Sequence, residues 1–164
     1  MFEKLSETKT LQKYHNTLPE MHWILIAEYD NPISQLEMGF LCYNGSKLPL
    51  DHMKAFHYFN LSSKQNVKEA HHNLGNMYYY GQYVGRDVTK AIYHKEKASN
   101  PNFARSQYDL YSLYMNDPNF QNINKAIYHL QLAAYNNYAD AQLVMGDYYL
   151  CGDFFPKNIN KAIE

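Results

Sequence analysis

The sequence predicts an all-helical fold, an α/α solenoid of stacked antiparallel helix hairpins. The dipeptide Lys-Ala recurs with its lysine at positions 54, 90, 125 and 161, at spacings of 36, 35 and 36 residues. An Asp or Asn stands three residues before each of these lysines, and both residue types cap the first N–H groups of helices. Two glycines also recur, at 39 and 45, 75 and 81, and 146 and 152. A fixed period of this length, holding two helix-length segments, is typical of an α-solenoid.

The first helix of a copy is clearest between residues 70 and 81. Ala70, Leu74, Met77 and Tyr78 recur at the spacing of one helical face. Gly81 is expected to end this helix, because glycine adopts positive φ without steric cost. The glycine that follows Leu74 lies inside the helix, where it costs about 1 kcal/mol relative to Ala. Its recurrence therefore predicts close approach by the paired helix.

The second helix of the same copy begins after the cap Asp87. Ala91 and Ala98 are small and permit tight packing against the first helix. The helix is expected to end at Asn100-Pro101, because proline lacks an N–H donor and disfavours helix in the residue before it. Each period is therefore one helical hairpin.

These landmarks resemble a known repeat. They are Ala70, Leu74, Gly75, Tyr78, Gly81, Val84, Asp87, Lys90, Ala91, Lys97 and Ala98. In this order and spacing they resemble the Sel-one-like repeat (SLR), a longer-looped relative of the tetratricopeptide repeat. The resemblance covers about residues 32–164 and implies a right-handed superhelix.

The period also predicts how the chain is divided. We expect an N-terminal cap over residues 1–31, made of an atypical helix and a lone second helix at 19–29 that contains Trp23. Capping segments depart from consensus because one face meets water. Four copies are expected at about 32–68, 69–103, 104–138 and 139–164, and the last one is incomplete. Either the sequence is a fragment, or a partner such as a second copy of the chain covers this end.

The third copy departs from the pattern. Tyr111 and Asp117 replace its two glycines, and its loop is one residue shorter. We expect either that the two helices of this copy splay apart locally or that Tyr111 turns outwards. Either change would alter the curvature of the solenoid.

Composition excludes several classes of partner. Lys and Arg number 15 against 16 Asp and Glu, for a formal charge of −1, so no global field favours nucleic acid or an anionic membrane. The longest apolar run, residues 23–27, is too short for a signal peptide or a membrane span. Cys42 and Cys151 lie three periods apart and are expected to be free thiols. A cytoplasmic location is expected.

The sequence predicts no enzymatic activity, metal or cofactor. It contains no nucleophile–base signature and no paired carboxylate motif, and the glycines around residues 81–85 follow a helix rather than a strand and lack the Lys-Ser/Thr of a phosphate loop. His94 and His129 share a register, but adjacent helix layers lie about 8–10 Å apart. That distance is too long for two ligands of one zinc ion.

The resemblance instead implies a binding surface, because the first helices of such repeats line the concave face. By register, the positions that face a partner segment combine aromatic, apolar and charged groups, as interface cores do. They are Leu36, Phe40, Tyr43, Glu69, His72, Asn76, Tyr79, Tyr80, Arg105, Tyr108, Ser112 and Met115.

The expected function is therefore that of an adaptor that binds a protein or peptide partner. Within the family, an alternative is a bacterial immunity protein that masks a toxin, and the Asn-, Lys- and Tyr-rich composition is compatible with a bacterial source. A further alternative is a hydrolase similar to cysteine-rich SLR proteins. Those proteins carry a cysteine pair in each repeat, which this chain lacks.

Overall fold

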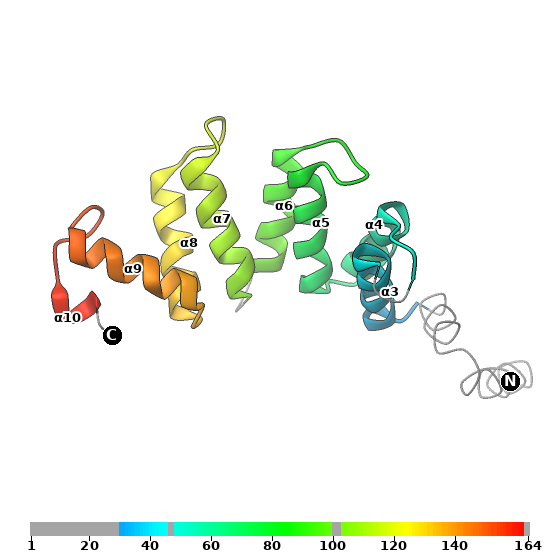
Figure 1. The fold of residues 1–164 in the computed structure, drawn as a ribbon, viewed down its shortest axis with the longest axis horizontal. Helices are drawn as coiled ribbons and strands as arrows, with labels where there is room; N and C mark the ends of the chain where they lie inside the picture. The colour runs from blue at the N-terminus through cyan, green and yellow to red at the C-terminus, as the bar shows by residue number, and fades with distance from the viewer. Residues whose placement is uncertain (1–29, 46–47, 100–102, 163–164) are drawn as a thin grey trace, which may run out of the picture. The chain divides into compact units, whose positions relative to one another are not determined.

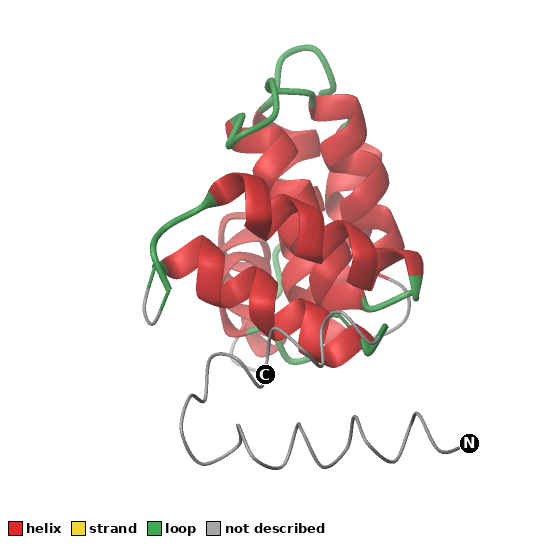
Figure 2. Cartoon of the chain, turned by 90° about the vertical axis from the view of Figure 1, so that its right-hand side faces the viewer, coloured by secondary structure: helices red, strands yellow, loops and turns green. Residues whose placement is uncertain are grey.

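The computed structural model describes residues 30–45, 48–99 and 103–162. Within these ranges all regular structure is helical, and no strand occurs (Figure 2). The all-α fold class predicted from the sequence is confirmed. The expected N-terminal cap, with its helix at 19–29 and Trp23, lies outside the described residues.

The helices carry the labels of Figure 1. The first helix of each copy, or A helix, is α3 (Pro32–Asn44), α5 (Lys68–Tyr80), α7 (Ala104–Asn116) or α9 (Ala139–Cys151). The second, or B helix, is α4 (His52–Lys64), α6 (Val88–Ser99), α8 (Ile123–Tyr135) or α10 (Ile159–Ala162). The chain forms two compact units, unit 1 up to Ala91 and unit 2 from Ile92 onwards, and the boundary falls inside α6.

The residues three before each repeated lysine cap the B helices, as predicted. Their side-chain oxygens accept the lysine backbone N–H at 2.9–3.1 Å in all four copies, from Asp51, Asp87, Asn122 and Asn158. The backbone N–H of each cap donates to a carbonyl near the end of the preceding A helix at 2.8–2.9 Å. The inter-helix loop is thus closed by the same pair of bonds in every copy.

The repeated lysine has a structural role of its own. The carbonyl that closes the loop belongs to Tyr78, Tyr114 or Tyr149 in the last three copies. In each of these copies the lysine ammonium lies 5.0–5.5 Å from the centre of that tyrosine ring, within the range of a cation–π contact. Cys42 takes the place of the tyrosine in the first copy. The Lys-Ala dipeptide is therefore tied to the end of the A helix as well as to the start of the B helix.

The recurrent glycines serve the two purposes that the sequence predicts. Gly45, Gly81 and Gly152 end their A helices with φ of 63°, 70° and 84°, a region that favours glycine. In the core of unit 1, a Cβ built on Gly39 would lie only 2.4 Å from two ring carbons of Phe59 on α4. Close approach by the paired helix is thus confirmed at this glycine.

The expectation for the third copy is wrong on both alternatives. Tyr111 is 8% exposed and belongs to the core of unit 2, and α7 and α8 pack together as extensively as α3 and α4 do. The physical reason is a compensating exchange of volume. At the register of Phe59 on α4, helix α8 carries the smaller Leu130, which is fully buried in the same cluster as Tyr111. The aromatic ring of this hairpin core therefore lies on the B helix in the first copy and on the A helix in the third.

The second copy places a charge at that same register. Lys95 on α6 is 3% exposed, and its ammonium lies 2.5 Å from the carboxylate of Asp109 on α7. Burial lowers the pKa of Lys95, and the carboxylate of Asp109 opposes that shift. This ion pair ties α6 to α7 within unit 2.

Candidate functional site

All twelve positions predicted to face a partner lie on the A helices α3, α5 and α7, but they differ in exposure. Leu36 and His72 are buried, with 7% and 4% of their surface exposed, so they offer almost nothing to a partner. Glu69, Tyr80 and Arg105 are exposed. The others are half-buried, namely Phe40, Tyr43, Asn76, Tyr79, Tyr108, Ser112 and Met115.

His72 is better described as a structural residue. It lies on the buried side of α5, and its Nε2 is 3.2 Å from the side-chain nitrogen of Asn76 one turn later. A buried polar group needs such a partner, because leaving it unpaired costs free energy. The sequence missed this because register alone does not say which of these positions are buried.

In unit 1 most of the accessible predicted positions are aromatic. The Tyr43 hydroxyl donates to Oε1 of Gln82 at 2.8 Å, which fixes the orientation of its ring. The Tyr79 ring packs edge-on against Tyr80 with centroids 5.1 Å apart, and the guanidinium of Arg86 lies 5.3 Å from its centre. Tyr80 itself is 67% exposed. We call the residues Phe40, Tyr43, Tyr79 and Tyr80 the unit 1 A face.

In unit 2 the corresponding surface is a continuous set of rings. Tyr108 lies 5.5 Å from the ring of Tyr111 and 5.1 Å from that of Tyr138. The hydroxyls of Tyr111 and Tyr148 are 2.8 Å apart, and Tyr148 packs against Phe154 with ring centres 4.6 Å apart. Burial, followed by the negative charge of Asp140, raises the pKa of Tyr108.

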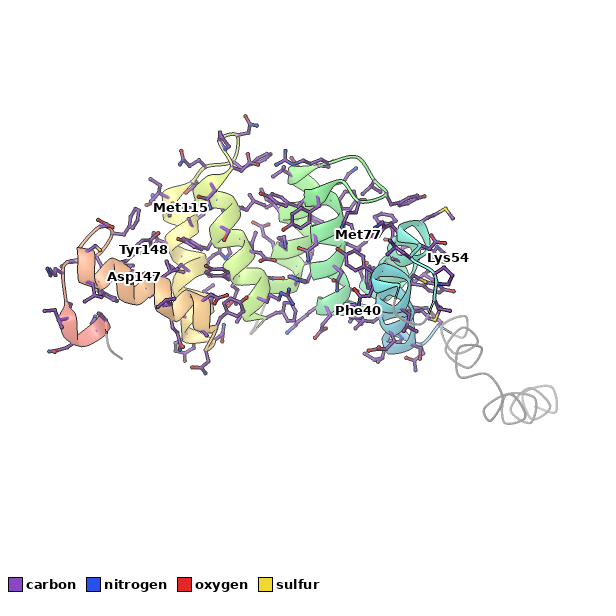
Figure 3. The ribbon with its side chains drawn as sticks, viewed as in Figure 1. Phe40, Lys54, Met77, Met115, Asp147 and Tyr148 are labelled. Atoms are coloured by element: carbon purple, nitrogen blue, oxygen red, sulfur yellow. The ribbon has the colours of Figure 1, made fainter. Side chains whose placement is uncertain are left out.

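These rings join α7 to α9, and Figure 3 marks Met115 and Tyr148 on the two helices. We call Arg105, Tyr108, Met115, Tyr138 and Tyr148 the unit 2 A face. The last two residues were not among the predicted positions. Tyr111 could have indicated them in the sequence, because a tyrosine in place of a core glycine requires a partner for its hydroxyl.

The sequence also missed a pocket beside α4 in unit 1. It has a volume of about 430 Å³ and is walled mainly by α4, with Met53, Phe56, His57 and Asn60, and by Tyr83 from the loop that precedes α6. The Phe56 and Tyr83 rings are 5.6 Å apart at its edge. Its walls are largely apolar, and no catalytic group converges on it.

Unit 2 also contains a largely buried titratable cluster. The Tyr114 hydroxyl donates to Glu96 at 3.1 Å, and the ring of His129 stacks on Tyr114 at 5.8 Å. Burial raises the pKa of Tyr114 to about 12 and lowers the pKa of His129. Tyr114 and His129 are 5% and 9% exposed, so little of either side chain is accessible to a substrate. The part of the chain that the structure describes also contains no group of three His, Cys, Asp or Glu side chains placed to hold a metal ion.

Two further observations concern the cysteines and the lengths of the described helices. Cys42 and Cys151 are free thiols, the first buried and the second exposed. Across the described ranges, every helix is too short or too polar to cross a bilayer.

Comparison with known proteins identifies the repeat. The Sel1 repeat family matches residues 32–67, 68–100, 119–138 and 139–164. The part of the third copy that it leaves out, residues 101–118, contains Tyr111 and Asp117, the two residues that replace glycines. No curated protein is significantly similar to the chain.

Solved structures share the fold. A Sel1 repeat protein from Oxalobacter formigenes superposes with a TM-score of 0.82 at 20% identity, over 87% of this chain and 59% of its own. A protective antigen present in uropathogenic Escherichia coli strains, which displays an SLR fold, superposes with a TM-score of 0.79 at 24% identity, over 87% of this chain and 31% of its own. The chain thus spans less than two thirds of the length of either protein. At these identities the likeness shows the solenoid fold alone.

Proposed function

Because the chain belongs to the Sel1 repeat family, whose members are generally protein–protein interaction modules, we propose that it is a non-enzymatic adaptor that binds a protein or peptide partner on the faces of its A helices. In this proposal the faces line the concave side of the solenoid, as the first helices of such repeats are expected to do.

The observation that carries the proposal is the ordered set of rings in the unit 2 A face. Tyr108, Tyr138 and Tyr148 are each half-buried, so each ring has one side in the protein and one side open to a partner. Ring contacts and the hydroxyl pair of Tyr111 and Tyr148 hold these side chains in place. Side chains that are already ordered lose little rotamer entropy on binding, and tyrosine is among the residues that dominate binding energy at interfaces.

The unit 1 A face supports the same proposal with one strongly exposed ring beside one that is held in place. Tyr80 is far more exposed than Tyr79, which is held by the ring of Tyr80 and by Arg86. An exposed aromatic beside an ordered one offers a partner a large apolar contact with a hydroxyl at its tip. Tyr79 and Tyr80 thus form one aromatic contact surface at the end of α5.

An affinity experiment with matched tyrosine variants tests this proposal. Tyr80→Ala together with Arg105→Ala removes one exposed side chain from each A face. Tyr128→Ala together with Tyr135→Ala is the control, because these tyrosines lie on the B helix α8 and are 57% and 85% exposed. Immobilised wild-type chain and both variants are incubated with the same cell extract, and the captured proteins are quantified by mass spectrometry.

The expected result is one partner that the wild type and the α8 variant retain and the A-face variant loses. A hot-spot residue contributes at least about 2 kcal/mol, so the loss is expected to reach roughly thirtyfold in affinity. Retention by the A-face variant, with loss by the α8 variant, would contradict the proposal.

A further inference from the structure

His129 is a titratable residue that the binding proposal does not use, and it is packed inside unit 2. It is 9% exposed, and its ring stacks on that of Tyr114, with centres 5.8 Å apart and planes inclined by 11°. Leu130, the next residue of α8, is fully buried in the core cluster that contains Tyr111 and Tyr114. The imidazole of His129 is therefore part of the contact between α7 and α8.

One ring nitrogen of His129 is buried without a hydrogen-bond partner among the residues that the structure describes. This nitrogen is Nδ1. The neutral imidazole carries a single proton, which can sit on Nε2 and leave Nδ1 as a bare acceptor. An imidazolium carries a proton on both nitrogens, so its Nδ1–H would be a buried donor without an acceptor, and an unpaired group costs more when it is charged. The site therefore accommodates the neutral ring and disfavours the charged one.

The groups around the His129 ring do not supply the missing acceptor. The titratable and charged groups that face it are Glu96 on α6, Tyr114 on α7, and Tyr128 and Lys125 on α8. The carboxylate of Glu96 accepts the Tyr114 hydroxyl at 3.1 Å, and the ammonium of Lys125 lies 5.0 Å from the centre of the Tyr114 ring. Burial lowers the pKa of His129; the carboxylate of Glu96 opposes this shift, and the ammonium of Lys125 adds to it. The nearby carboxylate is thus bonded to Tyr114, and a cation already lies against the ring on which the imidazole stacks.

We propose that His129 makes the packing of α8 on α7 sensitive to mild acid, because the neutral ring stays stacked on Tyr114 and a protonated ring leaves that position for water. Linkage gives the direction of the effect. The unfolded chain binds the proton near the ordinary histidine value of about pH 6.5, whereas burial makes the folded chain bind it less readily. The contribution of His129 to stability is therefore fully present above about pH 6.5 and is lost as the pH falls through the lowered pKa of the folded state.

The hairpin that responds to acid also supports the unit 2 A face. The Tyr108 ring of that face contacts Tyr111, which packs in one core cluster with Leu130 of α8. Loosening α8 would therefore release the rings that the proposed function uses. The acid response itself is a property of the packing between α7 and α8, so it stands or falls independently of whether the A faces bind a partner.

Titration of the folded chain tests the first step. The histidine ring signals of the full chain are followed by NMR between about pH 8 and pH 5, on either side of the ordinary histidine value. The signal that is missing in His129→Phe identifies His129. We expect this signal to titrate below about pH 6.5. Titration at or above that value would overturn the proposal.

Hydrogen exchange tests the effect on packing, because it reports the opening of each helix separately. Protection factors are measured by mass spectrometry at about pH 7.5 and pH 5.5 and corrected for the intrinsic pH dependence of amide exchange. One proton taken up on opening changes the equilibrium by at most about tenfold per pH unit, so we expect α7 and α8 to lose roughly threefold to tenfold protection at the lower pH. His129→Phe keeps a ring on Tyr114 and cannot titrate, so it should abolish this loss. His57→Gln, which replaces an exposed histidine of α4, is the control and should leave the loss unchanged.

Two further variants separate titration from a purely structural role of the ring. His129→Gln also cannot titrate and should abolish the acid response as His129→Phe does, so the test does not depend on one variant folding. Glu96→Gln removes the carboxylate that opposes the shift and keeps an acceptor for Tyr114, so it should enlarge the acid response. An equal response in the wild type and both His129 variants, or a response that His57→Gln removes, would overturn the proposal.

The two proposals fail in different ways. If α7 and α8 show no acid response but the cell-extract partner depends on Tyr80 and Arg105, the inference about His129 is wrong and the proposed function stands. If the acid response depends on His129 and the A-face variant loses no partner, the proposed binding surface is wrong and the inference about His129 stands.

Discussion

Replacing Gly39 by alanine tests how tightly the A and B helices of unit 1 are packed. An added Cβ would lie 2.4 Å from Cδ1 and Cε1 of Phe59, whereas carbon atoms in contact prefer about 3.5 Å. The ring would have to retreat by about 1 Å. It is fully buried, with Phe40 at 5.4 Å and Tyr43 at 6.1 Å between ring centres, so little space is open to it.

The size of the effect follows from two opposing contributions. Overpacking a dense core costs about 1–3 kcal/mol, and sometimes more. Alanine in place of glycine inside a helix returns about 1 kcal/mol. Because two ring carbons clash and the ring is confined, we expect overpacking to dominate. The expected net loss of unfolding free energy is about 1–2 kcal/mol.

The assay is urea unfolding followed by circular dichroism, with the free energy taken from linear extrapolation. Gly85→Ala is the control in the same unit, because a Cβ there would meet no atom within 4 Å, and its effect should stay within about 0.5 kcal/mol. Phe59→Leu restores the combination of a larger A-helix residue and a smaller B-helix residue that the third copy uses. In the double variant, Gly39→Ala should cost at least about 1 kcal/mol less than it does alone. Equal effects at Gly39 and Gly85, or strict additivity with Phe59→Leu, would refute the packing explanation.

Substitutions at three other sites, two in unit 2 and one helix cap in unit 1, are tested by the same unfolding assay. Asp109→Ala removes the carboxylate that lies 2.5 Å from the buried ammonium of Lys95 and should destabilise the protein by roughly 2–3 kcal/mol, below the usual cost because the aspartate is 31% exposed. Lys95→Met should be neutral or stabilising. Tyr111→Phe removes a buried hydroxyl bonded to Tyr148 and should cost about 1–2 kcal/mol; Tyr148→Phe, added to it, should cost little more. The pKa of Asp87 is lowered, first by the cap bond from the lysine amide three residues later. The stabilising effect of the Asp87 carboxylate is therefore present above about pH 3.8 and is lost as the pH falls through the lowered pKa. Asp87→Asn keeps the cap bond and should reduce this loss of stability in acid, and an unchanged dependence of stability on pH would contradict the assignment.

The sequence was most informative about features that repeat. The caps at Asp51, Asp87, Asn122 and Asn158 and the helix ends at Gly45, Gly81 and Gly152 depend on local backbone geometry, so they can be recognised from spacing alone. The lysine of the recurrent dipeptide was recognised as a landmark, but its contact with a tyrosine ring was not. That contact crosses from the B helix back to the A helix and has no local signature.

Departures from the repeat were harder to interpret. Tyr111 was expected to disturb its copy because glycine occupies this register in the other copies. That position by itself does not show which residue packs against it. The compensating residue, Leu130, lies on the other helix of the hairpin and looks ordinary in isolation. Packing is a property of the pair, so a substitution on one helix has to be considered together with its partner on the other.

The candidate binding surface was predictable only in part. Register placed the twelve residues on the A helices, but it did not distinguish Leu36 and His72, which are buried, from Tyr80, which is exposed. Exposure depends on what packs over a given position, and register does not show that.

The central claim is that the A helices bind a partner, and site-specific photo-crosslinking tests it most directly. A photoreactive phenylalanine derivative is placed singly at Tyr80 and Tyr108 on A helices and at Tyr128 and Tyr135 on the B helix α8. After irradiation in cells that contain the partner, we expect one shared crosslinked product from the two A-helix positions and none from α8. The same product from the α8 positions, with none from Tyr80 or Tyr108, would contradict the account.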